Sequence, residues 1–120
     1  MDKLEKFYAE VGADYNEVLG RLGGIPALVE KFLSKFEADG SMAELEKQLD
    51  AGATEEAFRA AHTLKGLCAN LGIQKLYEAS SAVTELLRAG DLDDARLGLP
   101  TLKKEYDRTL AALKDCGIGA

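Results

Sequence analysis

The chain has 120 residues, enough for one domain with a single hydrophobic core and too few for two. Leu, Ala, Glu and Lys dominate, Val and Ile are few and Trp is absent, so strong helix formers prevail and an all-α fold is expected. The net charge is −6, and no cluster of Lys or Arg could neutralise a phosphate backbone, which argues against nucleic acid as a partner.

The N-terminal stretch MDKLEKFYAE is charged and lacks the apolar core of a signal peptide. No segment approaches the roughly 20 apolar residues of a membrane span. We therefore expect a cytoplasmic protein with no membrane association, and a monomer. Met1 and the absence of a kinase region favour a freestanding protein.

Cys68 and Cys116 form no CxxC motif, so two reduced thiols are expected, with no metal site and no cofactor.

Helical periodicity interrupted by short breaks divides the first third of the chain into three elements. It predicts a helix over about residues 2–10 and a second that begins at Asp14 as N-cap and covers YNEVLGRL, up to a glycine pair. Pro26 suits the first turn of a third helix that continues to about Asp39. The expected apolar stripe of this helix consists of Leu28, Val29, Phe32, Leu33 and Phe36.

Two further helices follow the break at Gly40. Ser41 and Glu44 form a capping-box pattern at the start of the fourth helix. Its expected apolar face consists of Met42, Leu45 and Leu49, and Gly52 ends it. Thr54 is expected to cap the fifth helix, which ends at Gly72.

The last two helices complete the pattern. Residues 74–89 predict a sixth helix, with Leu76, Ala79, Val83 and Leu86 at heptad-like spacing. A seventh begins near Asp93 and runs to about Asp115, and Gly98 and Pro100 are expected to kink or divide it. Its expected core stripe is Leu99, Leu102, Tyr106, Leu110 and Leu113.

Connections of only a few residues favour antiparallel neighbours. The predicted fold is therefore an all-α, antiparallel up-and-down four-helix bundle with additional short N-terminal helices. Residues 1–120 are expected to form a single domain, with a short helical segment at 1–13 and the bundle at about 14–116.

The only histidine, His62, lies in the predicted fifth helix. At about 100° per residue, one face of this helix gathers the apolar side chains within roughly 40° of Ala57. That predicted buried stripe consists of Ala57, Ala61, Leu64, Cys68 and Leu71. His62 lies about 140° from Ala57 on the same wheel. The imidazole should therefore point to solvent, as a reactive group or as an incidental surface residue.

Three neighbours give this histidine a distinctive surrounding. Gly66 lies one turn further on the same face, where glycine costs about 1 kcal/mol relative to alanine. The missing side chain, with only Ala69 in the next turn, leaves a surface that another protein could approach closely. Lys65 is near enough to reach an anion attached to the ring. Close helix packing for Gly66 and simple solvation for Lys65 are the alternatives.

The stretch HTLKG at residues 62–66, followed by LG at 71–72, resembles the H-x-L-K-G-x(4)-L-G signature of histidine-containing phosphotransfer (HPt) domains, modules of bacterial and plant phosphorelays. The resemblance covers roughly residues 14–115. It implies that His62 carries the phosphoryl group, that Lys65 stabilises the phosphorylated form and that Gly66 admits the partner. Further candidates for receiver docking are Arg59, Ala69, Gln74 and Arg88.

The expected function is that of a phosphorelay intermediate. It would accept a phosphoryl group on His62 from a receiver-domain aspartate, or from a kinase, and pass it to another receiver aspartate. Response-regulator receiver domains and a hybrid histidine kinase are thus the expected partners. The sequence has no GxxxxGK[ST] phosphate loop, so neither ATPase nor autokinase activity is expected.

Two other functions remain open at this stage. One is a helical adaptor that binds receiver domains without phosphotransfer. The other is a helical enzyme with His62 as general base, against which stands the lack of a second histidine or a paired carboxylate signature.

Overall fold

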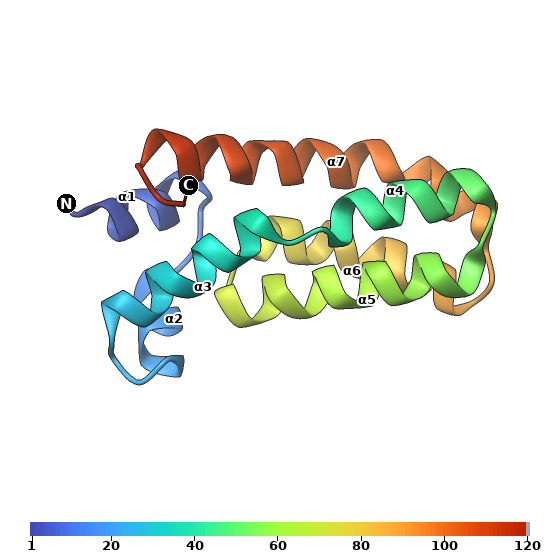
Figure 1. The fold of residues 1–120 in the computed structure, drawn as a ribbon. Helices are drawn as coiled ribbons and strands as arrows, with labels where there is room; N and C mark the ends of the chain where they lie inside the picture. The colour runs from blue at the N-terminus through green and yellow to red at the C-terminus, as the bar shows by residue number, and fades with distance from the viewer. Residues whose placement is uncertain (120) are drawn as a thin grey trace.

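The computed structural model describes residues 1–119, which form seven α-helices and no strand (Figure 1). The all-α prediction is confirmed. In chain order the helices are α1 (Lys3–Glu10), α2 (Tyr15–Arg21), α3 (Pro26–Ala38), α4 (Ser41–Ala51), α5 (Thr54–Leu71), α6 (Gln74–Arg88) and α7 (Leu92–Asp115).

Helices α4 to α7 form the four-helix bundle (Figure 1). They run alternately in opposite directions, because links of two or three residues leave each chain reversal next to the preceding helix. Helix α5 packs against both α4 and α6, and α7 packs against α6. Helix α3 extends beyond the start of α4, and α1 and α2 lie at that same end, near both termini (Figure 1). The predicted architecture is confirmed.

The core receives apolar side chains from all seven helices. The stripe predicted on α5 is confirmed, since every one of its five residues is at least 98 % buried. On α3 the stripe is narrower than predicted. Val29, Leu33 and Phe36 are buried, whereas Leu28 is partly exposed and Phe32 is exposed. Helix α3 lies beyond the start of α4, so fewer elements cover it.

Helix α6 buries a broader face than the heptad pattern predicted, because it lies between α5 and α7. Leu76 and Val83 are buried as expected, but Ala79 and Leu86 are only partly buried. The rest of the buried face consists of Ser80, Thr84 and Leu87. Both hydroxyls are satisfied within the helix, Ser80 donating to the Tyr77 carbonyl at 2.9 Å and Thr84 to the Ser80 carbonyl at 2.6 Å.

Helix starts follow the sequence signals in some places and not in others. Asp14 caps α2 as predicted, its carboxylate accepting from the Glu17 amide at 3.3 Å. The predicted capping box of α4 is wrong: the N-cap is Gly40, and the Asp39 carboxylate accepts from the Ser41 amide at 2.8 Å. Glu44 instead accepts a hydrogen bond from Gln48.

The Thr54 cap is wrong as well. Thr54 is already the first residue of α5, and the N-cap is Ala53, without a side-chain hydrogen bond. Only two residues separate α4 from α5, so the chain reaches helical geometry one residue earlier than predicted.

Helix α7 is a single helix of 24 residues. Of the two outcomes expected at Gly98 and Pro100, a kink or a division, the division is therefore wrong. It starts at Leu92, with Asp91 as N-cap accepting from the Asp94 amide at 3.0 Å. Pro100 is exposed, so the carbonyl that loses its donor there can be hydrated. In the predicted stripe, Leu102 and Leu113 are buried, and Leu99, Tyr106 and Leu110 are partly buried against the core.

The end of α5 is held by the N-terminal helices. Gly72 ends the helix in the left-handed conformation, with φ 63°. The Tyr8 hydroxyl donates to the Leu71 carbonyl at 2.8 Å, and Arg21 Nη1 donates to the Ala69 carbonyl at 3.2 Å. Tyr8 thus satisfies a carbonyl that the end of an α-helix leaves without an intrahelical donor, and Arg21 gives a second donor to the Ala69 carbonyl, which also accepts from the Gly72 amide at 3.3 Å.

None of the helices in the described part of the chain is both long and apolar enough to cross a membrane.

Replacing Gly72 by alanine should destabilise the fold by about 2–4 kcal/mol. An alanine there would have to adopt the left-handed backbone conformation of Gly72, and its Cβ would lie 2.5 Å from Val18 Cγ2. Gly90→Ala is the matched control: φ is also positive, at 77°, but its Cβ would meet nothing within 4 Å, so the loss should be about 1 kcal/mol. Urea unfolding measures both, and equal losses would contradict the packing argument.

Candidate functional site

His62 is exposed on α5, on the face opposite the buried stripe. Its ring stacks on Phe58, one turn earlier, with centroids 5.7 Å apart and planes 20° from parallel. Within residues 1–119, no hydrogen bond reaches the ring nitrogens. The stacking thus orients the imidazole without engaging its lone pair.

Lys65 lies on the side of α5 that faces α6. Its ammonium nitrogen is 3.5 Å from Glu85 Oε1, and its side chain is 21 % exposed. The other carboxylate oxygen of Glu85 accepts from Arg88 Nε at 2.9 Å. The Arg88 guanidinium carbon in turn lies 4.9 Å from the centroid of the Phe58 ring. Phe58, His62, Lys65, Glu85 and Arg88 therefore form one contiguous group, the histidine cluster.

The charges in the histidine cluster are not independent. The hydrogen bond from Arg88, followed by the charges of Arg88 and Lys65, holds the pKa of Glu85 below its usual range. Glu85 is therefore ionised at neutral pH. The cationic end of Lys65 rests on this carboxylate.

Gly66 lies in open space. A Cβ built on it would meet nothing within 4 Å, so the glycine is not needed for close helix packing. Ala69, one turn further, lines a hollow of about 140 Å³ together with Arg21, Gln74 and Tyr77. This hollow lies where α2 meets the end of α5 and the start of α6. The open face beside His62 thus continues toward Ala69 and Gln74.

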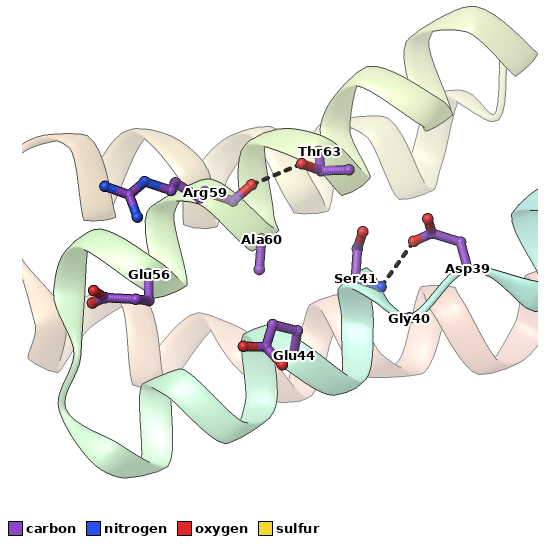
Figure 2. Close-up of a pocket in the computed structure, with 8 residues that line it drawn as sticks. All are labelled: Asp39, Gly40, Ser41, Glu44, Glu56, Arg59, Ala60 and Thr63. Atoms are coloured by element: carbon purple, nitrogen blue, oxygen red, sulfur yellow. Dashed lines mark hydrogen bonds between the residues drawn. The ribbon is translucent and has the colours of Figure 1, made fainter.

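Arg59 lies at the opposite edge of the His62 face, toward α4. It lines a groove of about 380 Å³ between α5 and the start of α4 (Figure 2). Within this groove, Thr63 donates to the Arg59 carbonyl at 3.0 Å. Of the docking candidates, the structure therefore places Arg88 against Phe58, Ala69 and Gln74 near α2, and Arg59 on the side of α4.

Sequence reasoning missed two members of the histidine cluster. Phe58 precedes His62 by four residues, a helical spacing that could have indicated ring contact. Glu85 precedes Arg88 by three residues, which suggests the pair between them, but its contact with Lys65 joins two helices and has no local signal.

The two thiols take no part in this site. Cys68 and Cys116 are both free and buried. Burial raises the pKa of the Cys68 thiol to about 12, which keeps it protonated and unreactive. Within residues 1–119, no group of three or more His, Cys, Asp or Glu side chains is placed to hold a metal ion.

In comparison with known protein families, residues 27–112 match the Hpt domain. This span contains the whole histidine cluster and most of the chain, and the chain therefore belongs to the Hpt domain family. Comparisons with curated proteins and with solved structures found no match. Hpt domains perform histidine phosphotransfer in two-component signalling, interact with receiver domains and kinases, and have no kinase activity of their own.

Gly66→Ala should raise the free energy of unfolding by about 1 kcal/mol, since alanine is the better helix former and its Cβ meets nothing. Gly98→Ala tests the same change in α7, where the new Cβ would lie 3.3 Å from Val83 Cγ2. Its gain should be smaller or reversed. Urea unfolding measures the change in the free energy of unfolding for both variants. A destabilised Gly66→Ala protein would show that Gly66 has a structural role.

Proposed function

We propose that this protein is a phosphorelay intermediate. His62 accepts a phosphoryl group from a receiver-domain aspartate, or from a kinase, and passes it to an aspartate of another receiver domain. Lys65 stabilises the phosphorylated state, and Gly66 and Ala69 form the centre of the receiver-docking face. Arg88, Gln74 and Arg59 lie around that face and contact the partner at its rim. The protein acts as a cytoplasmic monomer.

The chemistry requires one nucleophilic nitrogen. The lone pair of a neutral imidazole nitrogen forms the N–P bond while the P–O bond to the receiver aspartate breaks, and the bonding electrons leave on the carboxylate. The proton on the other ring nitrogen stays on the phosphorylated ring. In the return step an aspartate carboxylate oxygen forms a new P–O bond while the N–P bond breaks, and the electrons of that bond return to the ring nitrogen, which restores neutral imidazole. Such transfer depends mainly on in-line positioning and on neutralising the phosphoryl oxygens.

One observation carries the proposal: an exposed imidazole with unengaged nitrogens beside a glycine that leaves the adjoining surface open. A receiver domain has to bring its aspartate to within bonding distance of the ring, and any side chain at position 66 would stand in that path. The open space around Gly66 also means that packing does not require a glycine there.

His62→Gln should abolish phosphoryl uptake without unfolding the protein, because the side chain is exposed. Incubation with radiolabelled, phosphorylated receiver domains measures the uptake. The wild-type label should be acid-labile and alkali-stable, as expected of a phosphoramidate. Equal labelling of the wild-type protein and the variant would rule out His62 as the acceptor. Receiver binding by the wild-type protein with no label on it would instead indicate a helical adaptor.

Gly66→Gln should reduce the rate of exchange with a receiver domain by at least about tenfold, because the new side chain occupies the docking path. Gly20→Gln is the matched control: it also introduces glutamine at a helical glycine whose Cβ would meet nothing, but in α2. Rapid-quench kinetics measure both variants. Exchange by Gly66→Gln at the wild-type rate would remove the access argument.

A further inference from the structure

We propose that Glu85 is a positioning residue that competes with the phosphoryl group for Lys65 and so shortens the life of phosphorylated His62. The inference deepens the proposed function, on which it rests. Glu85, on α6, neither attacks nor receives the phosphoryl group, but its carboxylate contacts Lys65, the cation proposed to stabilise the phosphorylated ring.

Glu85 is bound at both oxygens: Oε2 accepts from Arg88 Nε at 2.9 Å, and Oε1 lies 3.5 Å from the Lys65 ammonium. Arg88 itself rests on the Phe58 ring. The Arg88 contact engages one carboxylate oxygen, and the second oxygen is directed toward Lys65.

The contact between Lys65 and Glu85 is long and half of the Glu85 side chain is exposed, so this pair is weak. A phosphoryl group on His62 would carry nearly two negative charges and three strong acceptor oxygens, within reach of a lysine three residues along the helix. Lys65 can therefore leave Glu85 for the phosphoryl group, and Glu85 can recover it once the group departs.

While Glu85 is ionised, stabilising the phosphoryl group costs the loss of an existing ion pair and places another negative charge nearby. Both effects raise the free energy of phosphorylated His62 relative to the unmodified protein. Neutralising Glu85 should therefore make phosphohistidine more persistent, which is the opposite of what removing Lys65 should do.

The test measures the lifetime of phosphohistidine without any receiver domain. Potassium phosphoramidate phosphorylates His62, the reagent is removed, and ³¹P NMR or intact mass follows the loss of the phosphoryl group at neutral pH. Glu85→Gln should lengthen the lifetime by about two- to fivefold at low ionic strength. In about 1 M NaCl, where the Debye length is about 3 Å, the difference should largely disappear.

Two controls separate this effect from a general change of charge. Glu105→Gln removes the same charge from another glutamate paired with an arginine three residues later, but on α7, and should leave the lifetime unchanged. Lys65→Ala should shorten the lifetime. In the Lys65→Ala protein, Glu85→Gln should then have a clearly smaller effect than in the wild type.

Equal lifetimes for the wild type and Glu85→Gln would overturn the inference, and so would a full effect of Glu85→Gln in the absence of Lys65. A wild-type protein that takes no phosphoryl group from phosphoramidate would overturn it too. The proposed function fails separately, if His62 is phosphorylated by phosphoramidate and keeps the predicted lifetimes but accepts nothing from any receiver domain.

Discussion

The burial of one face of α5 is the constraint on which the site depends. Ala57, Leu64 and Cys68 are held in the centre of the bundle, between α4 and α6, and this packing fixes the rotation of the helix about its axis. Since about 100° separates successive residues, fixing the buried face also fixes which residues meet solvent. His62 and Gly66 are thereby presented on a rigid helix rather than on a loop. A nucleophile held in this way needs little ordering when a partner arrives.

Much of the fold could be predicted because it follows from local sequence. Glycines at the ends of helices, a proline in the first turn and apolar residues at helical spacing placed the helices within a residue or two of where they lie. The errors arise where the surroundings of a residue override its local preference. Ser41 and Thr54 are good capping residues, but capping also depends on how a short link enters the helix. Pro100 disfavours a helix interior locally, yet α7 continues through it, with Leu102 and Leu113 anchored in the core.

The site divides in the same way between local and tertiary information. The exposure of His62 and its distance from the buried stripe follow from the helical wheel alone. What surrounds the ring does not, because the partner of Lys65 is on another helix and 20 residues away in sequence. The lysine that the sequence presents as a free cation is, in the unmodified protein, already paired with Glu85. Such a pairing depends on the register between α5 and α6, which no single-helix pattern contains.

The hydrogen bonds from Tyr8 and Arg21 to the last turn of α5 limit how far the chain can be shortened from its N-terminus. The family match starts at residue 27, which invites a clone trimmed to that point. Such a trimmed clone would lack both donors. The Leu71 carbonyl would be left to solvent, the Ala69 carbonyl would keep only the Gly72 amide, and the apolar surface on which Tyr8 now rests would be uncovered. Helix α5, which carries His62, would then fray from its C-terminal end. The shortest stably folded form of the protein therefore begins before Tyr8.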